Sequence, residues 1–310
     1  MTRHDPANPT VRATWTAVPR SPAAYELGEG PHWDPLGART SWVDINQGNL
    51  WAVEGTGVES EPQLLARLAE PLSVALPRVG GGWMCGTGTK VIALDDVGRT
   101  VARVTVESAG VRMNDGKADP AGRFWVGSKA HDNAVGRGSL WRIDLDGSVT
   151  RMLTGLTIAN GIGWSPDGRA MYITDSAAHR IDVHEFDSGS GSLGEARPFV
   201  RLADELGEPD GLTVDGNGDV WVAVWGGRCV RRYSPDGVLT GQVGVSTQLV
   251  SSCTFAGDDL SLLIITTAQE GLSDHALAED VHAGRLYTAQ VGVRGLPEPL
   301  VKVDLSGWSI

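Results

Sequence analysis

The stretch DPAGRFWVGS (residues 119–128) joins a polar turn containing glycine to an aromatic-led run in which side chains alternate in character. Similar phrases recur as DPLGARTSWVDI (34–45), RVGGGWMCGT (78–87), SPDGRAMYITD (165–175), DGNGDVWVAVW (215–225) and FAGDDLSLLIITT (255–267). The turn glycines Gly37, Gly122, Gly168 and Gly218 are separated by 85, 46 and 50 residues, and RVGGGWMCGT falls within the longest interval. A regular period of this size is typical of stacked or radial repeats. The chain therefore contains six similar units.

Each unit reads as β-structure. Its runs are short and alternate with period two, and a second such run usually follows, as in GSLWRIDLDG (138–147). Helical periodicity is limited to RLADELG (201–207), where we expect one helical turn, while AQEGLSDHALAEDVHAG (268–284) reads as a long loop. Six such units predict an all-β fold, a six-bladed β-propeller of four-stranded antiparallel blades around a central channel. Two β-sandwiches are the alternative, but they would not explain the period.

The repeats also suggest how the chain is divided. We expect residues 1–23 to be an N-terminal extension and residues 24–310 to be a single propeller domain. Propellers usually close their ring by pairing strands from the two ends of the chain in one blade. On this basis LVKVDL (300–305) is expected to complete the blade that begins near residue 24.

Composition narrows the class of protein. Lys and Arg number 26 against 38 Asp and Glu, a formal net charge of −12, which disfavours binding to nucleic acid or to an anionic membrane surface. Three cysteines without CxxC spacing do not form a disulfide framework and suit a reducing compartment. The first 15 residues lack the apolar segment of a signal peptide. We expect a cytoplasmic protein, monomeric or weakly oligomeric, with a small-molecule substrate.

Candidate ligands occur just upstream of the repeated turns. In a propeller the first strand of each blade lines the channel, so residues at one phase of successive repeats converge on the axis. An acid or amide followed by glycine recurs there, at Glu29, Asp115 (preceded by Asn114), Asn160 and Asp210. Any one such pair is most often only a turn. Their common phase predicts oxygen ligands around one axis, which suit a hard divalent cation and leave positions open for water and substrate.

At these residues the chain resembles the gluconolactonase/regucalcin family, also called the senescence marker protein family. The motifs that carry the resemblance are EGPHW (29–33), RMNDGKADPAGRFWVG (112–127), IANGIGWSPD (158–167) and PDGLTVD (209–215), within a similarity that covers roughly 24–305. The resemblance implies a six-bladed propeller that holds one divalent cation (Ca, Zn, Mn or Mg) near the channel mouth. It also implies a carboxylic ester hydrolase that opens sugar lactones in carbohydrate metabolism.

The resemblance assigns roles to individual residues. It places the metal ligands at Glu29, Asn160 and Asp210 and the substrate contacts at Arg112 and Asn114. It places a further acidic substrate contact near Asp132, where the local sequence SKAHDNAVG (128–136) departs from the animal regucalcins and also offers His131. In the implied reaction the cation polarises the lactone carbonyl, and Asp210 takes a proton from the attacking water.

Two other functions remain open from the sequence. One is a non-catalytic propeller that binds calcium or senses a ligand, because a fold does not fix a function. The other is a hydrolase of a different ester or of an organophosphate at the same metal site, which the 11 tryptophans would allow by forming an apolar pocket. A serine hydrolase is disfavoured, since no G-x-S-x-G motif is present.

Overall fold

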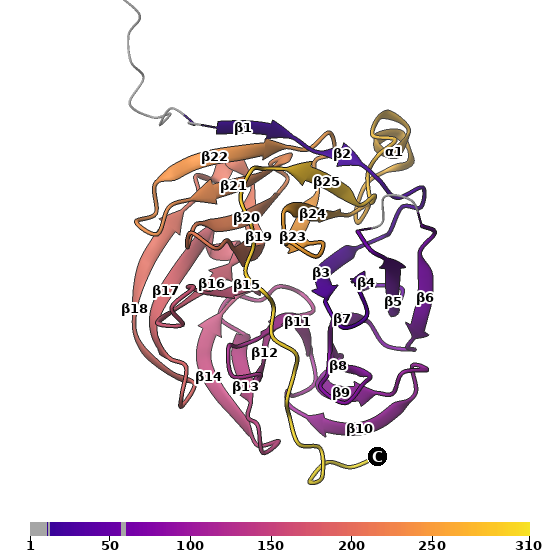
Figure 1. The fold of residues 1–310 in the computed structure, drawn as a ribbon, viewed down its shortest axis with the longest axis vertical. Coiled ribbons are helices and arrows are strands. Elements are labelled where there is room, and N and C mark those ends of the chain that lie inside the picture. The colour runs from indigo at the N-terminus through magenta and orange to yellow at the C-terminus, as the bar shows by residue number, and fades with distance from the viewer. Residues whose placement is uncertain (1–10, 12, 57–59) are drawn as a thin grey trace, which may run out of the picture.

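Six sheets surround one axis in the computed structural model, which describes residues 11, 13–56 and 60–310 (Figure 1). The arrangement is a six-bladed β-propeller, as the repeats predict. Each blade begins with its innermost strand and proceeds outward through antiparallel neighbours. The channel-lining strands are therefore β3, β7, β11, β15, β19 and β23, one from each repeat.

The blades follow one another along the chain. Blades 1 to 3 comprise β3 (Gly28–Asp34), β4 (Arg39–Asp44), β5 (Asn49–Glu54) and β6 (Gln63–Arg67); β7 (Leu72–Pro77), β8 (Trp83–Thr87), β9 (Lys90–Leu94) and β10 (Thr100–Thr105); and β11 (Val111–Ala118), β12 (Phe124–Ala130), β13 (Gly138–Ile143) and β14 (Val149–Leu156). Blades 4 to 6 comprise β15 (Ala159–Trp164), β16 (Ala170–Asp175), β17 (Arg180–Asp187) and β18 (Ser192–Arg201); β19 (Glu208–Val214), β20 (Val220–Trp225), β21 (Cys229–Tyr233) and β22 (Leu239–Gly244); and β23 (Val250–Ala256), β24 (Leu262–Thr267) and β25 (Tyr287–Gln290).

The repeated phrase forms a turn that is locked to the second strand of its blade. In blade 3, Asp119 accepts two backbone N–H groups of the turn, and its second oxygen accepts the indole N–H of Trp125 at 3.0 Å. In blade 5, Asp215 and Trp221 repeat these contacts with the same 3.0 Å indole distance. Gly122 has a φ of 94°, a conformation that other residues rarely adopt. The aspartate, glycine and tryptophan of the phrase thus serve one local structure.

Apolar side chains fill the space between neighbouring blades. The fully buried Trp42, Trp125 and Trp221 each lie on the second strand of their blade. Trp221 packs edge-on against Phe255 of the next blade, with ring centroids 5.7 Å apart, and both belong to a cluster that joins blades 5 and 6. Burial of this kind is the main source of stability in a fold whose blades do not share a sheet.

The ring does not close as the sequence suggested. Residues 300–305 form no blade strand; they run across one face in the yellow segment of Figure 1, where Val301 makes a parallel bridge to Arg78. The backbone N–H groups of Val301, Lys302 and Asp304 donate to carbonyl groups of Pro77, Gly122 and Leu145, so the segment crosses from blade 2 to blade 3 and does not pair along one strand. Closure comes instead from the other end of the chain.

Two short strands near the N-terminus close the ring. In blade 6, β2 (Val18–Pro19) pairs antiparallel with β25 as the outermost strand. In blade 5, β1 (Ala13–Thr16) adds to β22 as a fifth strand, and this pairing is parallel. Figure 1 shows both strands along the rim beside these blades. The N-terminal segment therefore joins the last two blades, whereas the sequence assigned this role to the C-terminal segment.

Helical structure is sparse. The single turn η2 (Asp204–Leu206) confirms the helical turn expected within residues 201–207, and η1 (Ser176–Ala178) follows β16. The expected loop at 268–284 contains the short helix α1 (Asp274–Glu279), which begins where Ser273 Oγ accepts the N–H of Ala276 at 3.2 Å. No helix in the described residues has the length and apolar character that would let it cross a membrane.

Candidate functional site

A polar cavity of about 250 Å³ lies at one end of the channel. Of the six residues that the resemblance assigns as ligands or substrate contacts, five line it together: Glu29, Arg112, Asn114, Asn160 and Asp210. They come from four innermost strands, β3, β11, β15 and β19, so the common phase of the repeats does bring them together. The remaining lining residues are Leu27, Ile45, Lys129, Asn133, Ile158, Ser176, Glu208, Trp225 and Glu270.

Each acid–glycine or amide–glycine pair lies at an irregularity of its strand. The pairing of β3 with β4 shifts between Glu29 and His32, and β11, β15 and β19 shift at the equivalent places. Such bulges redirect side chains, here toward the channel. The glycine is required by close approach: a Cβ on Gly161 would lie 2.5 Å from the carbonyl oxygen of Asp210 in the neighbouring strand. The oxygen-bearing residue and its glycine thus have separate tasks.

Two carboxylates are crowded in the cavity. Glu29 and Asp210 have only 7% and 5% of their surface exposed. Burial, reinforced by the charge of Asp115, raises the pKa of Glu29 to about 8. Burial and the charge of Glu29 also raise the pKa of Asp210 well above its usual range. Glu29 Oε2 accepts the N–H of Gly30 at 3.0 Å, whereas the buried Asp210 Oδ1 has no hydrogen-bond partner among the described residues.

A chain of hydrogen bonds fixes the amide beside these carboxylates. Arg112 Nη1 donates to Asn114 Oδ1 at 2.9 Å and to Ser73 Oγ at 3.3 Å. Asn114 Nδ2 donates to Asn160 Oδ1 at 3.1 Å, and Asn160 Nδ2 donates to Ser176 Oγ at 3.0 Å. The oxygen of Asn160 keeps a second lone pair, since a carbonyl accepts two hydrogen bonds. The two predicted substrate contacts therefore also orient the predicted amide ligand.

This donor set fits a hard divalent cation. It contains oxygen atoms alone, and a positive ion would relieve the repulsion between Glu29 and Asp210 and occupy the unpartnered Asp210 Oδ1. In the described part of the chain no three His, Cys, Asp or Glu side chains gather in a group that could hold an ion. The set therefore depends on the amide oxygen of Asn160 as well as on the two carboxylates.

Asp132 lies apart from the cavity lining. It is exposed, and its Oδ1 accepts the backbone N–H of Ala134 at 3.0 Å within its own turn. The adjacent Asn133, with a φ of 55°, lines the cavity instead, while His131 is exposed and does not line it. Nothing in the sequence distinguishes these neighbouring loop positions, because the direction of each side chain depends on the turn.

Four charged groups of the site received no individual role from the sequence. Asp115, at the common phase of the repeats, is half-buried, and burial raises its pKa to about 6 although the charge of Lys117 opposes this shift. Lys129 comes from the second strand of blade 3, and Glu208 begins β19. Glu270 comes from the segment 268–284 and accepts a hydrogen bond from Asn46 at 2.9 Å. A search limited to the phase of the innermost strands could find Asp115 alone.

Comparison with known proteins identifies the family. The model of the SMP-30/gluconolactonase/LRE-like region matches residues 27–269. The chain belongs to this family. It is 38% identical over 295 residues to an L-arabinolactonase of Azospirillum brasilense (93% of this chain, 95% of the relative) and 36% identical over 287 residues to a pentonolactonase of Haloferax volcanii (88% and 93%). The fold matches a calcium-binding regucalcin of Agrobacterium tumefaciens with a TM-score of 0.87 and 26% identity, covering 94% of this chain and 99% of that one.

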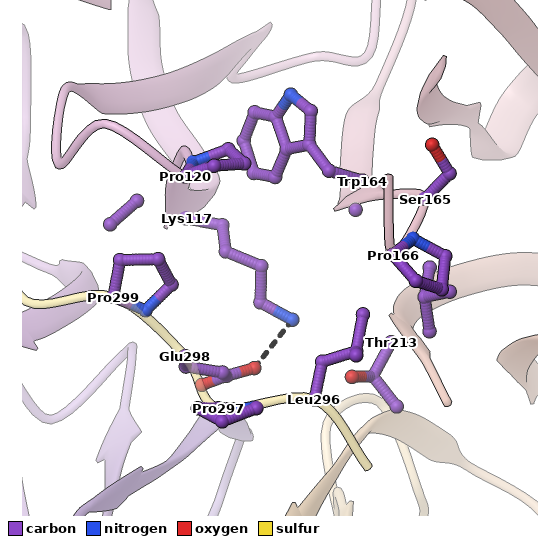
Figure 2. A pocket seen from close by; sticks show the side chains of 13 residues that line it. Lys117, Pro120, Trp164, Ser165, Pro166, Thr213, Leu296, Pro297, Glu298 and Pro299 are labelled. Atoms are coloured by element: carbon purple, nitrogen blue, oxygen red, sulfur yellow. Dashed lines mark ion pairs between the residues drawn. The ribbon is translucent and has the colours of Figure 1, made fainter. Parts of the chain in front are cut away.

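A second cavity lies at the other end of the channel. Figure 2 shows this cavity, of about 290 Å³, beside the C-terminal segment. Glu298 reaches into it from that segment and pairs with Lys117 at 2.7 Å and with His32 Nδ1 at 2.5 Å. Thr254 Oγ1 donates to the same carboxylate at 3.1 Å. Because the C-terminal segment lies across this end, we take the first cavity as the mouth used by ligands.

Proposed function

We propose that this chain hydrolyses a sugar lactone to the open-chain acid with a divalent cation held by Glu29, Asn160 and Asp210. The observation that carries the proposal is the crowding of two buried carboxylates beside an oriented amide, with Asp210 Oδ1 left without a partner. The relatives named above, an arabinolactonase and a pentonolactonase, make lactones of five-carbon sugar acids the first substrates to test.

The side chains around the cation site divide the remaining tasks. When bound, the cation supplies Lewis-acid polarisation of the lactone carbonyl. Asp210 accepts a proton from the attacking water; a bound cation keeps its carboxylate ionised and ready to accept that proton. Arg112 Nη1 donates to acceptors within the protein, and its other N–H groups can donate to oxygen atoms of the sugar. Asn114 holds both Arg112 and Asn160 in place.

Asp210→Asn tests this proposal directly. With L-arabinono-, D-xylono- and D-gluconolactone and added Mn²⁺, Mg²⁺, Ca²⁺ or Zn²⁺, the wild type should acidify a weakly buffered solution faster than background, and EDTA should abolish this activity. The variant should lose at least about 100-fold in kcat/KM, because it replaces an anionic ligand by a neutral amide and lacks the proton acceptor. The matched control is Asp236→Asn, in an exposed turn between β21 and β22, which should keep wild-type rates.

The possible outcomes separate the candidate functions. An Asp210→Asn variant with wild-type activity would show that Asp210 is neither ligand nor proton acceptor. Cation binding without turnover of any lactone would favour the non-catalytic calcium-binding propeller, to which the calcium-binding regucalcin of similar fold also points.

A further inference from the structure

Lys129 lies in the cavity without an assigned role. It is half-buried on β12 and lines the same wall as Arg112, its direct cross-strand partner on β11. Among the described residues its ammonium has no carboxylate within ion-pair distance and no hydrogen-bond acceptor. Lysine side chains are flexible and mostly remain in bulk water, so an ammonium confined in a ligand cavity without a partner calls for a functional explanation.

Four charged groups surround Lys129. Arg112 lies on the neighbouring strand, and the carboxylates of Glu270, Asp210 and Glu208 face it from other elements. Burial and the positive charge of Arg112 lower the pKa of Lys129, and the three carboxylates oppose this shift without cancelling it. Lys129 is therefore a better proton donor than a lysine on the surface.

Lactone opening needs a proton donor as well as a proton acceptor. When the bond between the acyl carbon and the ring oxygen breaks, the ring oxygen leaves as an alkoxide, which is strongly basic and must be protonated. Arg112 cannot serve, since a guanidinium does not release its proton in proteins. Asn114, Asn133 and Asn160 carry amides, which donate hydrogen bonds but do not transfer protons in the neutral range. Lys129 carries a transferable proton and is free to turn toward a ligand.

We propose that Lys129 is the general acid that protonates the ring oxygen of the lactone. The inference rests on the proposed function and adds a catalytic residue to it. The oxygen of water bonds to the acyl carbon and its proton passes to Asp210; the bond from that carbon to the ring oxygen breaks, and the ring oxygen keeps the electron pair and takes a proton from Nζ. Solvent then carries the proton from Asp210 back to Lys129, so the enzyme returns to its starting state.

Two substitutions separate acid catalysis from simple charge. Lys129→Arg keeps the positive charge but cannot release a proton, and Lys129→Met removes both. If Lys129 is the general acid, both variants should lose about 100-fold or more in kcat on a neutral sugar lactone, with KM changed by less than about threefold. If Lys129 only attracts or positions the substrate, Lys129→Arg should keep most of the wild-type kcat. That result would overturn the proposal.

The pH dependence of kcat gives a second readout. The wild type should lose activity on the alkaline side as Lys129 is deprotonated, and this limb should be absent from the residual activity of Lys129→Met. An alkaline limb unchanged in the variant would contradict the proposal. Calorimetric titration with Mn²⁺ should give the same cation affinity in wild type and both variants within about threefold, which shows that the loss of activity does not come from loss of the ion.

Controls distinguish this inference from the proposed function itself. Lys90→Arg and Lys90→Met alter a surface lysine that pairs with Glu70, and both should keep wild-type kcat. A wild type that hydrolyses no lactone refutes the proposed function and this inference together. An active wild type whose Lys129→Arg variant is equally active refutes the inference alone.

Discussion

Replacing Glu29 by Gln should make the cation-free protein more stable at pH 8 and less responsive to added cation. The side chain is buried next to Asp210 and Asp115, and its pKa lies at about 8 instead of 4.5. Folding in the absence of an ion therefore opposes ionisation of Glu29. Glutamine has nearly the same shape and carries no charge, so it removes this opposition while keeping a hydrogen-bonding oxygen in the cavity.

The direction and size of this stability change follow from proton linkage. Because the pKa of Glu29 is raised on folding, the stability penalty is absent below about pH 4.5, grows as the pH rises, and is complete above about pH 8. At about 1.4 kcal/mol per pKa unit, the upper limit is about 5 kcal/mol. Proton sharing with Asp210 and water entering the cavity reduce this penalty, so we expect Glu29→Gln to raise the free energy of unfolding by about 2–3 kcal/mol at pH 8. For a chain of 310 residues that corresponds to about 3–5 °C in Tm.

Thermal denaturation in EDTA between pH 5 and 8.5 measures this effect. The wild type and Glu29→Gln should melt at similar temperatures at pH 5 and diverge as the pH rises, with the variant higher at pH 8. Saturating Mn²⁺ or Ca²⁺ should raise the Tm of the wild type and have much less effect on the variant. The matched control is Glu195→Gln, an exposed glutamate on β18 far from the cavity lining, which should run parallel to the wild type. Parallel curves for Glu29→Gln would refute the reasoning.

Two further changes address the opposite channel end and the strand bulges. Glu298→Gln leaves Lys117 and His32 without their counter-charge. Urea denaturation should show a loss of about 2–4 kcal/mol in the free energy of unfolding, while kcat stays within about twofold of wild type. An unchanged free energy of unfolding would contradict the role of this ion pair. Gly211→Ala places a Cβ 2.5 Å from Ser252 Cβ. Calorimetry should show cation binding weakened at least about tenfold, and the double variant with Ser252→Gly should recover part of the affinity. Unaltered binding would show that this close approach does not position Asp210.

The fold could be predicted from the sequence because each blade repeats one local structure. The aspartate, glycine and tryptophan seen at Asp119, Gly122 and Trp125 form a turn that is encoded within about six residues, so the pattern is visible without tertiary information. Ring closure is not encoded in this way. The closing strand β2 has two residues, and its partner β25 lies more than 260 positions away, so a local pattern could not identify the pair.

The candidate site also has a part that the sequence predicts and a part that it does not. Glu29, Asn160 and Asp210 share a position in their repeats, and the periodicity alone predicts that they meet at the axis. Lys129 enters from the end of the second strand of its blade, outside the phase of the residue–glycine pairs, and Trp225 lines the cavity from the corresponding end of β20. The resemblance pointed to Asp132, with His131 beside it, but Asn133 between β12 and β13 lines the cavity, since its positive φ sets the course of the loop there.

The two sides of the candidate cation site are held by different forces. Asn160 is oriented by side chains, through Asn114 on one side and Ser176 on the other. Asp210 has no such support at Oδ1, and its strand is positioned by backbone contacts at Gly161 and by the packing of Gly211 against Ser252. A cation-dependent site can therefore tolerate rearrangement of polar side chains around Asp210 but not a change in the spacing of blades 4 to 6. Close approach accounts for glycine after Asn160 and Asp210, where an added Cβ would lie 2.5 Å or less from the neighbouring strand, whereas Gly30 is explained by its φ of 52°.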